Sequence, residues 1–362
     1  MNLNILHMIF SMERGGAETY LYNMLDNPEE DISIHVICNH RGSAHDRLEE
    51  RTGDIETVRM RHILDIGAAR RIATYCKEKD IDIIQAHFLR ENYIAVLSKL
   101  FNPRIRIIWT AHLIQQNNWI IRFLNRIFSS FIDRIICVSK AVEASIIEEG
   151  ISEDITQVIY NGVDTKYFKY IENGIREELS VPSDTLLLTT IARFHKEKGH
   201  SFLMDALKEL KEYIPNFRAL LLGEGKERDT IEDMMEEYGL DEQIMILGYT
   251  GDIIRILSAT DIYISPSKME AISFSILEAL SCGVPVVATH VGGVPEIFEK
   301  GNCGILVPFG DEKVFAKAIV ELYNSRSEYR HMRENCRNIV EEHFSQENML
   351  KDTYGLYREL GS

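Results

Sequence analysis

The sequence of 362 residues lacks the features that would mark a membrane-spanning, secreted or metal-binding protein. No apolar run approaches the roughly 20 residues that are needed to cross a bilayer. The N-terminal stretch MNLNILHMIF has no basic segment ahead of its apolar residues, so we do not expect a signal peptide. Only six cysteines occur, and none forms a Cys-x-x-Cys pair. This spacing is unlike that of a metal site and favours buried thiols in a reducing cytosol.

Basic residues are scarce as well. The chain has 40 Lys and Arg against 56 Asp and Glu, a net charge of −16 that argues against a nucleic-acid partner. Residues 99–140 are the exception, because they hold seven basic residues and one acid, Asp133. The basic residues are Lys99, Arg104, Arg106, Arg122, Arg126, Arg134 and Lys140. This segment is therefore a candidate surface for an anionic partner.

Short β-rich runs alternate with amphipathic stretches along the chain, which is the pattern of parallel βαβ units. One series of runs ends near residue 159 and a second begins near residue 186. Residues 167–184 between them are polar and without periodicity, which is typical of a linker. The chain is also longer than a usual single core. The sequence therefore predicts an α/β fold of two doubly wound domains, residues 1–166 and 185–345, with a last helix at 346–360.

Ligands of doubly wound sheets bind beyond the carboxyl ends of the strands, so the loops after strands are the candidate sites. In the first half these loops contain Gly15-Gly16, His87 and His112. Paired glycines let backbone N–H groups approach an anion, or form a tight turn and nothing more. We interpret His87 as a packing residue and leave both packing and binding open for His112.

In the second half, the loop after the run 186–192 contains Arg193 and Lys198. Arginine can bind phosphate with two parallel hydrogen bonds, and lysine binds it as a point charge. The alternative is a solvated surface pair. We expect these two cations at the mouth of the second sheet, where they would form a phosphate-binding site.

The segment SPSKMEAISFSILEAL, which starts at Ser265, places Glu270 and Glu278 on either side of seven residues. Glu270 follows a predicted strand, and Glu278 lies two turns into a predicted helix. The residues between them are largely apolar, so the segment is buried and its carboxylates need a ligand or partner. Carboxylates accept hydrogen bonds from sugar hydroxyls, and N–H groups at a helix start bind phosphate. The pattern predicts a nucleotide-sugar site.

In this order along the chain, the loops resemble those of the retaining GT-B glycosyltransferases of family 4, from about Leu3 to Val307. The shared pattern is a Gly-Gly-x-Glu loop, a strand-end His, an Asn-Gly-Val-Asp turn, an Arg…Lys-Gly loop, a Gly-x-Gly turn and Glu-x7-Glu. The resemblance implies two Rossmann-like domains that face each other across a cleft. The N-terminal domain would bind the acceptor, the C-terminal domain would bind the nucleotide-sugar, and the helix 346–360 would pack back on the N-terminal domain.

The resemblance also implies roles for individual residues. Arg193 and Lys198 would bind the diphosphate, Glu278 the ribose and Glu270 the transferred sugar, with His112 beside that sugar. We therefore expect Glu270, His112, Arg193 and Lys198 to be the catalytic residues.

The remaining donor contacts implied by the resemblance come largely from backbone. Gly16 would line the phosphate from the other domain, and N–H groups at Ala271, Ile272, Ser273 and Phe274 would face the phosphate and sugar. Ala271 stands where the family often has Gly, and Ser273 where Gly or Pro is frequent. The identity of the sugar therefore stays open.

The mechanism implied is attack on the face that the diphosphate leaves, with that diphosphate taking the acceptor proton. No metal or other cofactor is expected, because two cations already neutralise the diphosphate. Asp80-Ile81-Asp82 spells the Asp-x-Asp of metal-dependent glycosyltransferases. It stands before a predicted strand and so at the wrong end of the sheet for a ligand.

We expect a glycosyltransferase that moves a hexose-type sugar from a nucleotide-sugar, with uridine as the family's commonest base, to a hydroxyl of a carbohydrate or lipid-linked acceptor. Its place would be bacterial cell-surface polysaccharide or glycolipid synthesis, in the cytoplasm or at the inner face of the membrane. Two alternatives remain: a nucleotide-sugar 2-epimerase of the same fold, and a non-catalytic GT-B subunit. The base, the acceptor and the oligomeric state stay open.

Residues 119–132 read as an amphipathic helix within the basic segment. We expect most of its apolar stripe to pack on the sheet, with Trp119, Arg122 and Arg126 beside it; the stripe comprises Ile120, Phe123, Leu124, Ile127, Phe128 and Phe131. The alternatives are an ordinary cover helix with solvated arginines and a surface that meets an anionic membrane. We predict the membrane contact.

Overall fold

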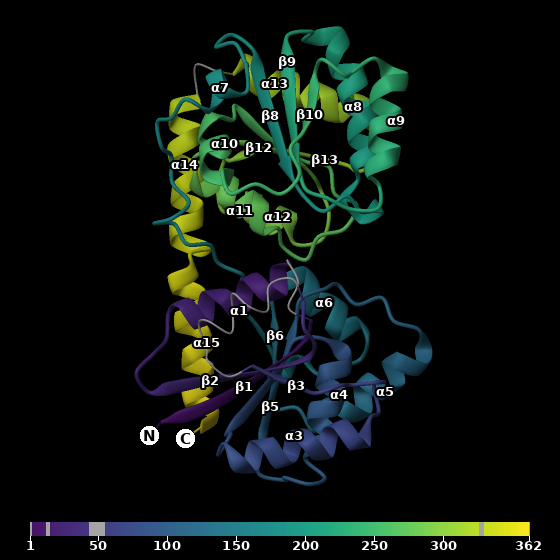
Figure 1. Ribbon diagram of the computed structural model, residues 1–362, viewed down its shortest axis with the longest axis vertical. Coiled ribbons are helices and arrows are strands. Elements are labelled where there is room, and N and C mark those ends of the chain that lie inside the picture. The colour runs from purple at the N-terminus through teal and green to yellow at the C-terminus, as the bar shows by residue number, and fades with distance from the viewer. Residues whose placement is uncertain (1, 12–14, 43–54, 326–328, 362) are drawn as a thin grey trace. The chain divides into compact units, whose positions relative to one another are not determined.

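The computed structural model describes residues 2–11, 15–42, 55–325 and 329–361. Its contacts divide the chain into two compact units. The first consists of residues 1–161 together with 346–362, and the second of residues 162–345. Each unit is built on one parallel sheet that is covered by helices (Figure 1). The predicted class of two doubly wound α/β sheets is confirmed.

The first unit has a seven-stranded sheet in the order β3-β2-β1-β4-β5-β6-β7. All its neighbouring strands are parallel. The order reverses between β1 and β4, which is the point where such sheets bind ligands. The elements are β1 (Leu3–Ser11), α1 (Gly16–Asp26), β2 (Ile32–His40), β3 (Ile55–Thr57), α3 (Ile66–Glu78), β4 (Ile83–Ala86), α4 (Leu89–Ser98), β5 (Arg106–Ala111), α5 (Trp119–Ser129), β6 (Arg134–Cys137), α6 (Lys140–Glu148), η1 (Glu153–Ile155), β7 (Thr156–Val158) and α15 (Gln346–Gly361).

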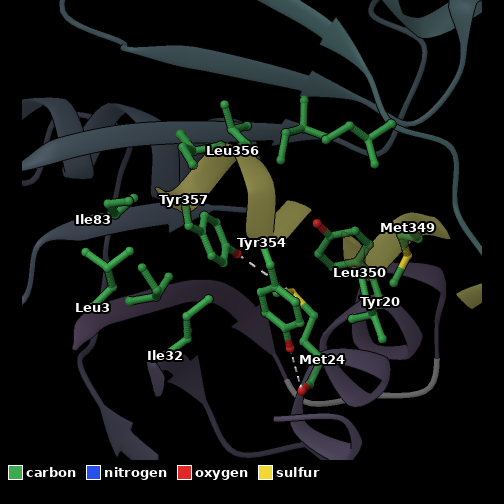
Figure 2. Close-up of a cluster of buried hydrophobic side chains, with 14 residues drawn as sticks. Leu3, Tyr20, Met24, Ile32, Ile83, Met349, Leu350, Tyr354, Leu356 and Tyr357 are labelled. Carbon is green, nitrogen blue, oxygen red and sulfur yellow. Dashed lines mark hydrogen bonds between the residues drawn. The ribbon is translucent and has the colours of Figure 1, made fainter. Parts of the chain in front are cut away.

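The C-terminal helix α15 packs on this sheet, although more than 180 residues separate the two in sequence. Its buried side chains Leu350, Tyr354 and Tyr357 join residues of β1, α1, β2 and β4 in one apolar cluster (Figure 2). The Tyr354 hydroxyl donates to the carbonyls of Met24 and Asn27, at 3.1 and 2.9 Å. The observed helix begins at Gln346, the residue at which the sequence places its start.

The second unit has a six-stranded parallel sheet in the order β10-β9-β8-β11-β12-β13. Its order reverses between β8 and β11. The elements are α7 (Ile175–Glu178), β8 (Leu186–Ile191), η2 (Lys196–Lys198), α8 (His200–Tyr213), β9 (Phe217–Leu222), α9 (Arg228–Tyr238), β10 (Ile244–Ile246), α10 (Ile253–Ala259), β11 (Ile262–Ser265), α11 (Phe274–Ser281), β12 (Val286–Thr289), α12 (Val294–Phe298), β13 (Gly304–Val307), α13 (Glu312–Asn324) and α14 (Tyr329–His343).

Residues 167–184 do not form the separate linker that we expected, and the first unit ends at residue 161 and not at 166. Ile175 and Val181 are buried in a cluster with strand residues of the second sheet. Arg176, in the short helix α7, donates to the Asp261 carboxylate at 2.6 Å. Two apolar anchors and an arginine therefore attach this polar segment to the second unit, and their wide spacing hides them from a periodicity search.

Helix α5 contradicts our expectation that its apolar stripe packs on the sheet. The residues of α5 that are buried are Asn125 and Ser129. The Asn125 amide accepts from the Tyr93 hydroxyl at 2.6 Å and donates to the Glu149 carboxylate at 2.5 Å. Most of the stripe is exposed instead, with Phe123 at 59% and Trp119 beside it at 77%; the other exposed members are Ile120, Ile127 and, just beyond the helix, Phe131. Leu124 and Phe128 are half-buried, and the Phe128 ring stacks on Tyr93 of α4. The inner face of α5 therefore combines a polar network with two half-buried apolar side chains, and most of the apolar stripe is left exposed.

All six cysteines are buried and unpaired. None of the helices in the described ranges combines the length and apolarity that a bilayer span requires.

Candidate active site

At the switch point of the second sheet, the loop after β8 and the loop after β11 are held against each other. Gly199 has φ of 69°, and a Cβ there would lie 2.0 Å from the Pro266 carbonyl oxygen. The backbone N–H of Lys268 donates to the Glu197 carbonyl at 2.8 Å. This close approach brings Lys198 and Glu270 together, although 72 residues separate them in sequence.

Lys198 and Glu270 form a short ion pair, with Nζ 2.6 Å from Oε1. The Ser267 hydroxyl donates to the same carboxylate oxygen at 2.7 Å. Glu270 is 8% exposed, whereas Lys198 is half-buried. The pair therefore presents a fixed cation and a fixed carboxylate side by side at the end of the sheet. The structure brings these two predicted site residues together.

Arg193 lies in the same loop, but its guanidinium is exposed and makes no hydrogen bond or ion pair with the part of the chain that the structure describes. Its neighbour Phe194 is buried and anchored, since its N–H donates to the Glu224 carbonyl at 2.9 Å and its carbonyl accepts from Glu227 N at 3.1 Å. Gly225 permits this approach, because a Cβ there would lie 2.3 Å from the Phe194 carbonyl oxygen. The backbone is thus fixed while the cation is free to bind an anion.

Helix α11 begins within this loop cluster. Its N-cap is Ser273, whose hydroxyl accepts from the Ile276 N–H at 3.4 Å. The N–H groups of the first helical residues, Phe274 and Ser275, have no partner within the helix because they begin it. Ala271 and Ile272 complete the turn between Glu270 and the cap. An anion at this end of the helix would meet free donors and the positive end of the helix dipole.

Glu278 lies in the middle of α11 and is half-buried. Burial raises the pKa of its carboxyl to about 7. Its carboxylate makes no hydrogen bond or ion pair among the described residues, in contrast to Glu270. A half-buried acceptor without a partner is suited to a neutral hydrogen-bond donor such as a hydroxyl.

In the first unit, His112 directly follows β5 and belongs to a chain of histidines that sequence reasoning missed. Its Nε2 lies 2.9 Å from Nδ1 of His87, and Nε2 of His87 lies 2.9 Å from Nδ1 of His7. The interpretation of His87 as a packing residue is therefore incomplete. His7 lies within β1, whereas His87 and His112 directly follow β4 and β5, and the parallel pairing of these strands brings the rings together. A search for polar residues inside apolar strands could have found His7.

The other predicted residues of the first unit lie on two helices, α1 and α5. Gly16 begins α1 and is exposed. Trp119, Arg122 and Arg126 lie on α5 and are exposed, and the Arg122 guanidinium donates to the Glu148 carbonyl. With Phe123, they line a hollow of about 390 Å³.

Two family models match this chain. "Glycosyltransferase Family 4" matches residues 14–167, and "Glycosyl transferases group 1" matches residues 172–339. N-acetyl-alpha-D-glucosaminyl L-malate synthase of Bacillus anthracis is 26% identical over 82% of this chain and 79% of its own length. The UDP-Gal:alpha-D-GlcNAc-diphosphoundecaprenol alpha-1,3-galactosyltransferase of Escherichia coli is 23% identical over 90% of each chain.

Solved structures share the fold. Alr3699/HepE of Anabaena, crystallised in complex with UDP, has a TM-score of 0.88 at 22% identity, covering 99% of this chain and 100% of that one. A second neighbour, the glycosyltransferase WaaG, has a TM-score of 0.71 at 14% identity, covering 96% of this chain and 98% of its own. The two family models, the relatives and the two parallel sheets together show that the chain belongs to the glycosyltransferases of family 4 and has the two-domain GT-B fold.

Proposed function

We propose that this glycosyltransferase moves a sugar from a UDP-sugar to a hydroxyl of a carbohydrate or lipid-linked acceptor, with retention at the anomeric carbon and without a metal. The observation that carries the proposal is the Lys198–Glu270 pair beside the free Arg193 guanidinium and the start of α11. Two of the proteins described above support the choice of donor and acceptor: one structure holds UDP, and the Escherichia coli enzyme is named for UDP-Gal and a diphosphoundecaprenol acceptor.

In the proposed complex, Arg193 and Lys198 bind the diphosphate together with the free N–H groups of α11. The N–H groups of α11 and the backbone that carries Arg193 and Lys198 are fixed before the reaction, so the charge that grows on the leaving diphosphate is stabilised with little further rearrangement. Glu270 accepts hydrogen bonds from the sugar, and Glu278 accepts them from the ribose hydroxyls. Glu270 is held by Lys198 and Ser267, whereas the Glu278 carboxylate has no partner among the described residues, and this difference supports the division of roles.

The transfer step breaks the bond between the anomeric carbon and the diphosphate oxygen and forms a bond from that carbon to the acceptor oxygen. The acceptor proton passes to an oxygen of the departing diphosphate. Glu270 is held by Lys198 and Ser267, which favours a role as an orienting acceptor over that of a covalent nucleophile.

Metal independence is also part of the proposal. The Asp82 carboxylate of the Asp-x-Asp sequence accepts from the Asn4 N–H at 2.9 Å, just before β4 begins. It is thus engaged at the amino end of the strand. Turnover should persist in excess chelator. A loss of turnover that added magnesium restores would contradict metal independence.

We further propose that α5 rests on an anionic membrane surface, where a lipid-linked acceptor is available. The outward apolar row provides aromatic side chains for the interface, and Arg122 and Arg126 on the same helix provide positive charge. Beside the row lies a hollow of about 600 Å³ whose lining includes Leu100, Ile127 and Phe131. An apolar hollow next to cations suits a lipid better than it suits a soluble sugar.

The experiment that tests the function is a transfer assay with nucleotide-sugars selected by thermal shift, since a ligand that binds the native state raises its stability. UDP-sugars should raise the melting temperature, and the best of them should glycosylate a polyprenyl-diphosphate sugar. Incubation of donor without acceptor separates the alternatives. Epimerised donor would identify a 2-epimerase, and no binding of any nucleotide-sugar would favour a non-catalytic subunit.

A further inference from the structure

The core of the first unit contains an unbroken line of polar side chains. Nδ1 of His7 lies 2.9 Å from Nε2 of His87, and Nδ1 of His87 lies 2.9 Å from Nε2 of His112. Successive ring centroids lie 5.2 Å apart and the ring planes differ by 20°, so the rings lie edge to edge and nearly coplanar, as in-plane hydrogen bonds require. His7 and His87 are 0% and 1% exposed, whereas His112 is half-buried. The line thus leads from the interior to the carboxyl end of β5.

At its inner end the line continues into α15. The Tyr357 hydroxyl lies 3.3 Å from Nε2 of His7 and donates to Oε1 of Gln85. The Gln85 amide in turn donates to the Thr110 hydroxyl at 2.6 Å and to the Tyr20 hydroxyl at 3.3 Å. Figure 2 shows Tyr357 pointing from α15 into the cluster that contains Tyr20.

These contacts give the line a direction. The two amide protons of Gln85 are donated to the Thr110 and Tyr20 hydroxyls. The Gln85 oxygen can only accept, so the Tyr357 hydroxyl must donate its proton to that oxygen. The Tyr357 oxygen then accepts from Nε2–H of His7. A neutral imidazole carries one N–H, so Nδ1 of His7 accepts from His87, and Nδ1 of His87 accepts from His112.

The same order requires His7 and His87 to be neutral, because each accepts through Nδ1 and an imidazolium has no acceptor nitrogen. Burial lowers the pKa of His7 and of His112 to about 3, and it lowers the pKa of His87 well below its ordinary value. The hydrogen-bond order and the burial agree for His7 and His87, and burial favours the neutral form of His112 as well. At the outer end, Nδ1 of His112 is left with a lone pair and has no partner among the described residues.

We propose that Gln85 and Tyr357 are positioning residues, which act through His7 and His87 to hold His112 in the tautomer whose Nδ1 accepts a hydrogen bond from a hydroxyl of the carbohydrate substrate. The proposal rests on the proposed function, which supplies that substrate. It assigns the C-terminal helix a part in the chemistry of the first unit. It also predicts that the group recognised at His112 is a hydrogen-bond donor.

The test compares two tyrosines of α15 that are both buried and both hydrogen-bonded. Tyr357→Phe removes the hydroxyl that ends the histidine line and keeps the ring. Tyr354→Phe is the matched control, because its hydroxyl serves the Met24 and Asn27 carbonyls and does not touch the line. Nitrogen-15 NMR of the histidines in the free protein reports the tautomers, with His112 assigned by its absence in His112→Asn. Steady-state transfer kinetics report kcat and the donor KM.

Wild type should show three neutral Nε2–H rings. Tyr357→Phe should convert His112 to a mixture of tautomers and lower kcat about tenfold, the scale of one lost hydrogen bond, with donor KM within about twofold. Tyr354→Phe should change neither readout. An Nδ1–H tautomer of His112 in wild type, or equal kcat in the two variants, would overturn the proposal. A third outcome is that wild type shows the expected tautomers but transfers no sugar. This would overturn the proposed function and the contact of His112 with substrate, and would leave the hydrogen-bond order of the histidines standing.

Discussion

From the core of the first unit to the carboxyl end of its sheet, His7, His87 and His112 are bonded to one another in a line, and burial lowers the pKa of each. At the corresponding end of the second sheet, Lys198 and Glu270 are charged and paired, and Arg193 has no partner among the described residues. Both sites lie where the strand order reverses, so the architecture alone does not explain the difference. The free cation and the free helix start indicate an anionic ligand for the second unit. The histidine line is suited to neutral hydroxyls.

The largest expected effect concerns the Glu270 carboxylate in the site of the second unit. Glu270→Gln should lower turnover about a hundredfold or more, because it removes a fixed charge aimed at the reacting sugar. The affinity for UDP should change by less than about threefold, since the sugar and not the diphosphate is the partner. Steady-state kinetics and calorimetry measure the two quantities. Glu197→Gln, an exposed charge change in the neighbouring loop, is the control, and equal losses of turnover in both variants would reject the role.

The second-largest effect is expected for the two cations of the same site, Arg193 and Lys198. Arg193→Ala and Lys198→Ala should each weaken UDP binding by about 1.5–3 kcal/mol, the scale of hydrogen bonds to charged groups. Uridine should bind these variants and wild type almost equally. Calorimetry measures the affinities for UDP and uridine. Lys196→Ala, which removes an exposed cation in the same turn, is the control and should bind UDP as wild type does. Loss of uridine binding in the variants would mean that the diphosphate assignment is wrong.

A third prediction contrasts α5 with α3 of the same unit. Arg122→Glu/Arg126→Glu should weaken binding to anionic vesicles by about 2 kcal/mol or more, at about 1 kcal/mol for each cation near such a surface. Arg70→Glu/Arg71→Glu makes the same charge change on exposed positions of α3 and should leave binding intact. Vesicle sedimentation measures both, and salt should weaken wild-type binding. Wild type that stays in the supernatant at low salt would exclude the membrane contact.

The smallest effect concerns Glu278. Its carboxyl pKa is about 7 in the folded protein and near 4.5 when unfolded, so the folded state binds more protons between these values. Stability from this group is therefore present below about pH 4.5 and is lost as the pH rises through 7. Glu278→Gln should raise the free energy of unfolding relative to wild type by about 1–2 kcal/mol at pH 8, and by little at pH 5. Urea unfolding at pH 5 and pH 8 measures these free energies. An equal difference between Glu278→Gln and wild type at the two pH values would contradict the prediction.

Strand alternation and the loops after strands were enough to predict the two parallel sheets. The Glu-x7-Glu spacing places Glu270 and Glu278 in one loop-helix segment, because both lie close together in sequence. His7 and His87 were missed as partners of His112, since their contact depends on the register of β1, β4 and β5. The burial of Asn125 in α5 was missed because it depends on Tyr93 and Glu149, which lie outside that helix.

The central claim is that the second unit binds a diphosphate through its own cations, and calorimetric titration of the wild-type protein with uridine, UMP and UDP tests it most directly. The affinity should rise from uridine to UDP by about tenfold or more, since UDP alone supplies both phosphates to Arg193, Lys198 and the start of α11. Raised salt should reduce the gain. Equal affinities for uridine and UDP, or no binding of UDP at all, would contradict the account.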